Sequence, residues 1–194
     1  SLTNWPFTSG PTDQHPFVGL ENYIAIFDSP EFQGSLGFSL FFVFAAMTIE
    51  LVLGLAIALL FDRKFPLKRI IVPVCIMPLV LPPLMIGLCF RALFDPTLGI
   101  VNYYLGISGT WEAVWTASAD KGRILVLITD VWQFTPFVFL ILYSALQGFP
   151  EEYKEAARID GASTFQVFRY ITVPRLRYFI IVAALFRFIG ALKI

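Results

Sequence analysis

The chain has 194 residues, of which 57% are apolar and only 14% are charged, and its basic and acidic residues balance to a net charge of zero. A soluble domain of this length carries about a quarter charged residues, so this composition, with a mean hydropathy of +0.74, favours a protein whose solvent is largely lipid. Lys and Arg form no basic cluster of the kind that nucleic-acid binding requires.

The sequence contains few residues suited to metal binding or thiol chemistry. His15 is the single histidine, which excludes most histidine-based metal sites and catalytic triads. Cys75 and Cys89 lie 14 residues apart in one apolar segment, or roughly 21 Å along a helix, which is too far for a disulfide. We therefore predict no metal site, no cofactor and no catalytic residue.

Four apolar segments are long enough to cross a membrane, which takes about 20 helical residues. They are 36–61, 70–94, 124–149 and 178–194. A buried helix of a soluble bundle would show polar positions at a 3.6-residue period, and 51–61 shows none. The expected fold class is an all-α membrane protein, a polytopic transmembrane helix bundle forming a single domain over 1–194.

Basic residues alternate between the links, which sets the orientation. Residues 1–62 contain no Lys or Arg, the link 62–69 carries four, and the link 148–177 carries five. We therefore place 1–35 and 95–122 outside, and 62–69 and 148–177 inside. The chain begins at Ser1 and not at Met, and residues 190–194 lie inside an apolar run, so we expect a fragment truncated at both ends. An outside N-terminus with no anchor before it also suggests that at least one earlier span is missing.

The second apolar segment contains Pro73, Pro78, Pro82 and Pro83. Proline removes a helical hydrogen bond and clashes with the preceding turn, and membranes tolerate this where neighbours satisfy the freed carbonyls. We expect a kinked helix packed inside the bundle, acting either as a bent structural helix or as part of a gate. The outer link that follows is expected to form an interfacial helix or to contact a soluble partner.

Charged residues inside spans are costly and mark functional sites by default. Four qualify by position: Glu50, Arg91, Asp130 and Arg187. We expect Glu50 to pair within the bundle and Arg91 to reach the outer interface.

The inside link before the last span predicts two short helices. Pro150 and the acids that follow it favour a helix start, and Gly161 suits a left-handed helix end. Ser163 with Gln166 forms a capping-box pattern that starts a second helix, which Pro174 is expected to end. The product is a helix–turn–helix knuckle, either a docking surface for another protein or an ordinary amphipathic surface helix.

This link resembles the EAA loop of ABC importer permeases. The family pattern is E-A-A, three residues, G, nine residues, I, one residue and L-P. Here it reads Glu155-Ala156-Ala157, Gly161, Ile171 and Pro174, with Val173 in place of Leu. Further stretches are similar to the carbohydrate branch of that family, related to maltose and glycerol-phosphate permeases: 17–23, 78–83, 93–96 with Gly99 and Asn102, Trp132 and 135–137.

The resemblance implies a permease of the type I ABC importer kind, multi-pass in the bacterial cytoplasmic (inner) membrane, with about six spans in the full protein. Its partners would be ATP-binding cassette ATPase subunits, a second permease subunit, a periplasmic or lipid-anchored solute-binding protein and a sugar. The coupling loop, 150–174, would dock on an ATPase through Glu155, Ala156, Ala157, Arg158, Asp160, Gly161, Ile171 and Pro174. ATP hydrolysis would belong to the partner, since no P-loop pattern occurs here.

A substrate pathway follows partly from spacing and partly from the resemblance. Asp130, Phe134 and Phe137 share one face of the third span at i, i+4 and i+7, and in maltose-type relatives such positions face the sugar. The same resemblance places Arg187, Gly190 and Ala191 along the pathway. An acid beside aromatic rings suits hydroxyl binding and sugar stacking; aromatic packing between helices is the alternative.

Two other functions stay open at this stage. A permease for glycerol phosphate, a polyol or another small solute would use the same fold. A phosphate ester favours a cationic lining, which Arg187 could supply, although Asp130 argues against it. An ATP-independent secondary transporter would have no use for a docking knuckle between Pro150 and Pro174.

Overall fold

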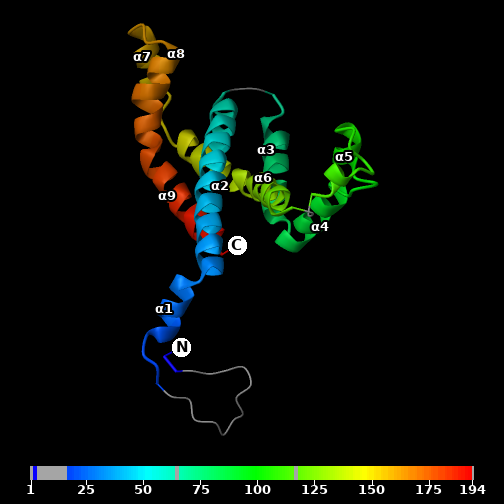
Figure 1. Ribbon diagram of the computed structural model, residues 1–194. Coiled ribbons are helices and arrows are strands. Elements are labelled where there is room, and N and C mark those ends of the chain that lie inside the picture. The colour runs from blue at the N-terminus through cyan, green and yellow to red at the C-terminus, as the bar shows by residue number, and fades with distance from the viewer. Residues whose placement is uncertain (1, 4–16, 64–65, 116–117, 194) are drawn as a thin grey trace.

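The computed structural model describes residues 2–3, 17–63, 66–115 and 118–193; His15 lies outside this part of the chain. The described residues form helices joined by short links, with one isolated β-bridge between Thr3 and Phe17. The helices, shown in Figure 1, are α1 (Glu21–Asp28), α2 (Pro30–Asp62), α3 (Lys68–Val80), α4 (Pro83–Leu93), α5 (Ile100–Tyr104), α6 (Ala119–Gln147), α7 (Glu152–Ile159), α8 (Thr164–Val167) and α9 (Val173–Ala191). A 3₁₀ turn spans Trp111–Ala113, and a π-helical turn spans Phe168–Thr172.

Two long helices, α2 and α6, form the centre of the bundle. Each is long and apolar enough to cross a membrane, and α3 with α4 would add a third span if the pair is one broken helix. Helix α9 carries Arg175, Arg177 and Arg187 within 19 residues and is not among these candidates, so the fourth span stays a prediction. The fold class is confirmed as an all-α transmembrane bundle.

Burial follows the shared helix faces. The main core joins Ala58 of α2 with Val138, Phe139 and Leu142 of α6, all 0% exposed. On the outer faces of the same helices, large apolar side chains stay exposed, for example Phe41 at 67%. Since such faces are unfavourable in water, they suit lipid or further membrane helices.

A glycine sets how closely α2 and α6 approach each other. A Cβ atom on Gly54 would lie 2.6 Å from Cγ1 of Val138 and 3.0 Å from the backbone nitrogen of Phe139. Real Cβ atoms do not approach so closely, and the Phe139 backbone cannot rotate aside as a side chain would. The two helices can therefore pack this tightly only because position 54 has no side chain.

We expect Gly54→Ala to destabilise the full-length protein by about 1–3 kcal/mol, the usual cost of overpacking a core. The measurement is thermal unfolding in detergent. Gly37→Ala is the matched control on the same helix, because nothing lies within 4 Å of a Cβ there. Equal melting temperatures for the two variants would show that this crossing is not tight.

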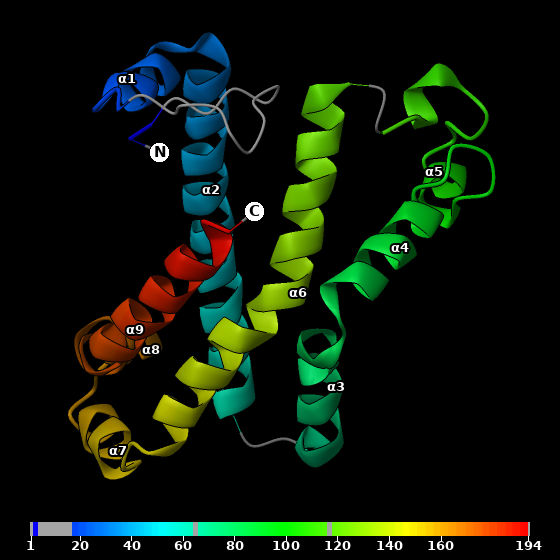
Figure 2. The ribbon, with the colours of Figure 1, turned by 90° about the horizontal axis from the view of Figure 1, so that it is seen from below.

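The second apolar segment differs from the single kinked helix that was predicted. Helices α3 and α4 are separate and bent by 98° at Leu81 and Pro82 (Figure 2). Consecutive prolines at 82 and 83 explain the break, since proline also drives the preceding residue to extended backbone, and Leu81 has a ψ of 137°. No residue of α3 is buried, so α3 is also less enclosed than expected, packing mainly on α6.

The outer link is organised around one buried amide. The side-chain nitrogen of Asn102 donates to the carbonyls of Phe94, Asp95 and Ala113, and its oxygen accepts from the indole N–H of Trp115 at 2.8 Å. A buried polar group whose bonds are all made fixes the chain around it. The link is thereby folded back over α4 and contains the short helix α5. A position of this helix at the membrane interface stays a prediction, as does contact with a soluble partner.

Candidate functional site

A buried charged cluster joins the three central helices. It consists of Glu50 on α2, Asp130 on α6 and Arg187 on α9, which are 0%, 6% and 3% exposed. The guanidinium of Arg187 bonds both carboxylate oxygens of Glu50, through Nε to Oε2 and through Nη2 to Oε1 at 2.7 Å. The same Nη2 donates to Oδ2 of Asp130 at 2.7 Å. The expectation that Glu50 pairs within the bundle matches this geometry.

An aromatic ring completes the cluster. The guanidinium carbon of Arg187 lies 4.1 Å from the ring centroid of Phe134, one helical turn after Asp130. Such a position is a cation–π contact. Arg187 is thus held on its edge by two carboxylates and on its face by a ring, as expected for a charge retained at membrane depth.

A cavity of about 650 Å³ lies beside this cluster, between α4, α6 and the outer link. Asp130 and Phe134 line it, together with Thr129 and Gln133 of the same helix. Gln133 also donates to the carbonyl of Leu81 at 3.5 Å, which ties α6 to the break between α3 and α4. The cavity therefore adjoins both the buried charges and the sharpest bend in the bundle.

The structure divides the predicted pathway residues into two groups. Asp130, Phe134 and Gly190 line the cavity. Phe137 instead packs edge-on against Phe186, with centroids 6.2 Å apart. Arg187 and Ala191 are buried and are not among the residues that line the cavity.

Gly190 lines the cavity and also lies next to Arg187. A Cβ atom there would lie 3.3 Å from Nη1 of Arg187, so the absent side chain leaves room for the guanidinium. Asp130 and Phe134 thus line the cavity and Phe137 does not, and the role of all three in a solute pathway stays a prediction.

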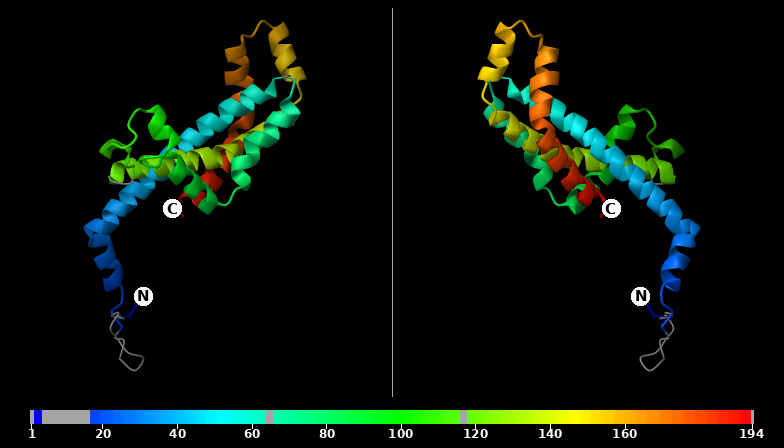
Figure 3. Two further views of the ribbon diagram at one scale, coloured as in Figure 1. Left: turned by 90° about the vertical axis from the view of Figure 1, so that its right-hand side faces the viewer. Right: turned by 90° about the vertical axis from the view of Figure 1, so that its left-hand side faces the viewer.

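The predicted coupling loop forms the knuckle. Helix α7 ends at Ile159, and Gly161, two residues later, has a φ of +82°. The N–H of Ala162 bonds the carbonyl of Ala157 at 2.9 Å and that of Gly161 bonds Arg158 at 3.1 Å, the pattern of a Schellman ending. Ser163 and Gln166 form the predicted capping box at the start of α8. In Figures 1 and 3 this knuckle projects beyond the ends of the central helices.

The prediction that Pro174 ends the second short helix is wrong. The chain passes from α8 through the π-helical turn at Phe168–Thr172 into α9, where Pro174 occupies the first turn. A missing N–H is tolerated in a first turn. The chain therefore stays helical from Thr164 to Ala191, and α8 and α9 form one continuous arm.

The loop residues gather at two places on the knuckle. Asp160, Gly161 and Ile171 line a shallow groove of about 310 Å³. Glu155 and Arg158 border a second hollow, shared with Asp62 at the end of α2. Apolar side chains are exposed nearby, with Ile159 at 86% and Phe165 at 70%; an exposed apolar group beside charges is typical of an interaction surface.

Two contacts that the sequence did not reveal hold α7 to the bundle. Lys154 forms an ion pair with Asp62, 92 residues earlier in the chain, and both side chains are mostly buried. Arg175 of α9 lies 3.7 Å from the ring centroid of Tyr153. Helix α7 therefore contacts the end of α2 through Asp62 and contacts α9 through Arg175.

We expect a double-mutant cycle with Lys154→Met and Asp62→Asn to give a coupling energy of about 1–3 kcal/mol, the range for hydrogen bonds between charged groups. The measurement is thermal unfolding of the full-length protein. The control cycle uses the exposed pair Arg123 and Asp120, which are 3.3 Å apart and should give below about 0.5 kcal/mol. A coupling energy no larger than that of the control would show that Lys154 and Asp62 are independent.

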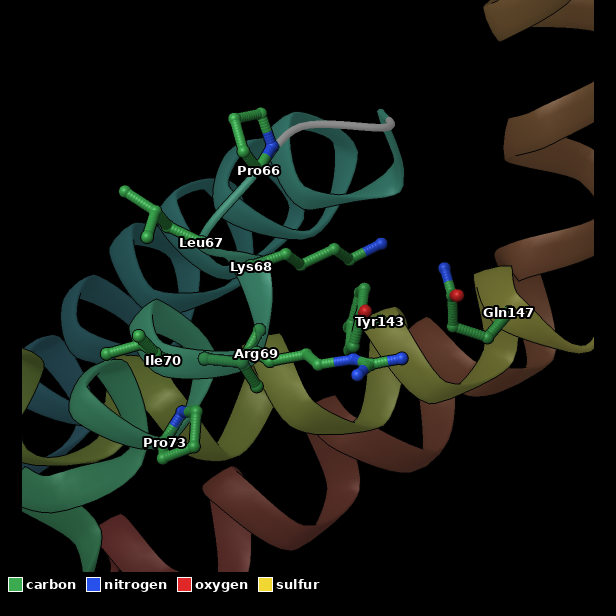
Figure 4. Close-up of a pocket in the computed structure, with 9 residues that line it drawn as sticks. Pro66, Leu67, Lys68, Arg69, Ile70, Pro73, Tyr143 and Gln147 are labelled. Atoms are coloured by element: carbon green, nitrogen blue, oxygen red, sulfur yellow. The ribbon is translucent and has the colours of Figure 1, made fainter.

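A further cavity of about 1160 Å³ lies near the link from α2 to α3 (Figure 4). Lys68 and Arg69 extend along it, and the Lys68 nitrogen lies 5.0 Å from the ring centroid of Tyr143. Lys68 and Arg69 belong to the link 62–69, which is predicted to face the cytoplasm. None of the charged cluster residues Glu50, Asp130 and Arg187 lines this cavity.

The site residues that sequence reasoning missed are Gln133, Lys154 and Asp62, along with the pairing of Glu50 with Arg187. Gln133 could have been found, since it lies three residues after Asp130 and so shares its face. Buried charges need partners, and this requirement points to a Glu50–Arg187 pair among the charged span residues. No local pattern points to Lys154 and Asp62, since both look like ordinary surface residues.

The fold and the site define a membrane helix bundle with a buried charged centre and a projecting knuckle, the architecture of a transporter subunit. Residues 50–194 match the model of the family described as binding-protein-dependent transport system inner membrane component. This match covers most of the chain, and the chain belongs to that family, whose members are inner membrane proteins.

Curated relatives are similar over nearly the whole chain. The probable ABC transporter permease protein y4oQ of Sinorhizobium fredii is 35% identical over 99% of this chain and 62% of its own length. The trehalose/maltose transport system permease protein MalF of Thermococcus litoralis is 33% identical over 93% of this chain and 61% of its own length. The chain thus spans about three fifths of these relatives.

A solved structure shares the fold. A chain of a bacterial ABC transporter involved in the import of the acidic polysaccharide alginate superposes with a TM-score of 0.81 at 17% identity, covering 92% of this chain and 63% of that one. At this identity the likeness concerns the fold alone.

Proposed function

We propose that the chain is part of the membrane-spanning permease subunit of an ATP-driven importer, which carries a sugar or sugar-like solute across the cytoplasmic membrane. The observation that carries the proposal is the knuckle: its Schellman ending, capping box and continuous α8–α9 arm make a rigid lever on the bundle. Family membership and the curated relatives, which include a trehalose/maltose permease, support the solute class.

The proposed mechanism uses two permease subunits above two ATPase subunits, with a solute-binding protein delivering the sugar outside. Closure of the ATPase pair on ATP would displace the knuckle, and the contacts of α7 with α2 and α9 would pass that movement to the bundle. This is a rigid-body transition driven by a ligand that binds one state more tightly. The chain's own role is passage and coupling, with ATP hydrolysis in the separate subunit.

Each part of the predicted loop has a role in this scheme. Glu155 and Arg158 would make polar contacts with the ATPase, Ala156 and Ala157 would allow close approach, and the groove at Gly161 would receive an ATPase side chain. Asp130, Phe134 and Gly190, which line the cavity, would face the solute.

The test is uptake by the full-length permease, reconstituted in liposomes with its ATPase and binding-protein partners. A panel of radiolabelled sugars, each with the binding protein, is offered with ATP or with a non-hydrolysable analogue inside. We expect at least one sugar to accumulate only with hydrolysable ATP. Accumulation that is indifferent to ATP would instead identify a secondary transporter.

A further inference from the structure

Arg187 is the cation that pairs with Asp130 at the cavity wall, and its guanidinium is not free to bind an anionic solute. Its guanidinium is already occupied, with Nε and Nη2 on Glu50, Nη2 also on Asp130, and its face on Phe134. It does not line the cavity and is 3% exposed. A phosphate, sulfonate or carboxylate in the cavity could reach it only by breaking these bonds.

The charges that do line the cavity are unfavourable to an anion. Among the described residues, two acids, Asp130 and Asp95, and one cation, Arg91, line the cavity. Asp95 follows Arg91 by one helical turn and offsets its charge, and the backbone N–H of Leu98, followed by that of Thr97, holds the pKa of Asp95 below its usual range. Asp95 therefore stays ionised at neutral pH.

The remaining lining suits a neutral ring with hydroxyl groups. Phe90, Phe94, Phe134 and Trp115 supply aromatic surface, and Thr129 and Gln133 supply polar groups next to Asp130. Aromatic faces attract the C–H edges of a sugar, while a carboxylate and an amide accept and donate bonds to hydroxyls. Cavities that combine apolar walls with a few placed polar groups are typical of small-molecule sites.

We infer that this cavity takes an uncharged polyhydroxylated solute in preference to an anionic one, and that Arg187 is a positioning residue that holds Asp130 at the cavity wall and does not bind the solute. The inference rests on the proposed function and sharpens it. It separates this chain from relatives such as the sn-glycerol-3-phosphate permease UgpA of Pectobacterium atrosepticum, whose named solute is an anion.

The experiment measures equilibrium binding to the full-length permease complex in nanodiscs, without the solute-binding protein, so that only the permease selects. The probes are matched pairs: glucose with glucuronate, galactose with galacturonate, a glucose disaccharide with its uronic acid, and glycerol with glycerol 3-phosphate. We expect at least one neutral member to bind about tenfold or more tightly than its anionic counterpart, the factor that about 1.4 kcal/mol produces.

Variants separate the roles of the charges. Asp130→Asn, which keeps the shape of the side chain, should weaken binding of the neutral member and narrow the ratio of neutral to anionic affinity. Asp120→Asn on the same helix removes the same charge from an exposed acid that does not line the cavity, and it should leave neutral binding within about twofold. Gln133→Leu leaves the charged cluster intact and should also weaken the neutral member, so it tests the same wall if Asp130→Asn fails to insert.

Three results would overturn the inference. The first is an anionic member that binds as tightly as its neutral partner; if Arg187→Gln then abolishes that binding, Arg187 is an anion receptor. The second is neutral binding that is unchanged by both wall variants. The third is no binding of any probe, which removes the cavity as a solute site while ATP-driven uptake would still carry the proposed function.

Discussion

Arg187→Leu is expected to destabilise the full-length permease by about 3–5 kcal/mol, the cost of leaving a buried charge without its partner. The substitution would strand the carboxylates of Glu50 and Asp130, which are 0% and 6% exposed, at one point between α2 and α6. The measurement is the unfolding midpoint in detergent. Arg177→Leu is the control on the same helix: its side chain is exposed and its recorded bond goes to the neighbouring Tyr178, so it should shift stability by less than about 0.5 kcal/mol.

The triple variant Glu50→Leu, Asp130→Leu, Arg187→Leu tests whether the loss comes from unpaired charge and not from lost packing. Replacing a whole buried ionic cluster by apolar residues of similar volume is often neutral or stabilising. We therefore expect the triple variant to regain most of the lost stability, while solute binding stays lost because Asp130 is absent. An Arg187→Leu midpoint within the range of the control would show that the cluster does not hold α2, α6 and α9 together.

Hydropathy and local signals were sufficient for the two central helices and the knuckle, and insufficient for the contacts between distant residues. The apolar runs predicted α2 and α6 because a membrane helix satisfies its own backbone and needs only length and composition. The knuckle followed from Gly161 and from Ser163 with Gln166, since caps depend on residues three or four positions apart. The observed Schellman bonds and capping box confirm that part.

The contacts that make the site are between distant residues. Glu50 and Arg187 are separated by 137 positions, so their pairing depends on how α2 and α9 cross and not on any local pattern. The effects of proline were misjudged for the same reason. The consequence of a proline depends on its surroundings. The helix breaks by 98° at Pro82, whereas the arm continues through Pro174, which follows a π-helical turn. Proline position alone predicted neither outcome.

Gly161→Val is expected to reduce ATP-driven uptake at least tenfold while the permease still inserts. At φ +82° position 161 lies in the left-handed region, which costs a residue with a Cβ about 1–2 kcal/mol and is a genuine outlier for a β-branched one. Nothing lies within 4 Å of a Cβ there, so the strain is in the backbone and not in packing. Relieving it would break the Schellman ending and turn α7 away from α8.

Gly161→Asn isolates this cause, because asparagine is several-fold enriched at positive φ; we expect it to keep more than half of the uptake. Gly106→Val is the matched control for backbone strain: its φ is +70° with equally open surroundings, but it lies in the outer link. Uptake and co-purification of the ATPase subunit should both fall for Gly161→Val and persist for Gly106→Val. If uptake falls equally in the two valine variants, backbone strain anywhere in the chain is enough to reduce transport. That result would contradict the proposal that the knuckle transmits movement between the ATPase and the bundle.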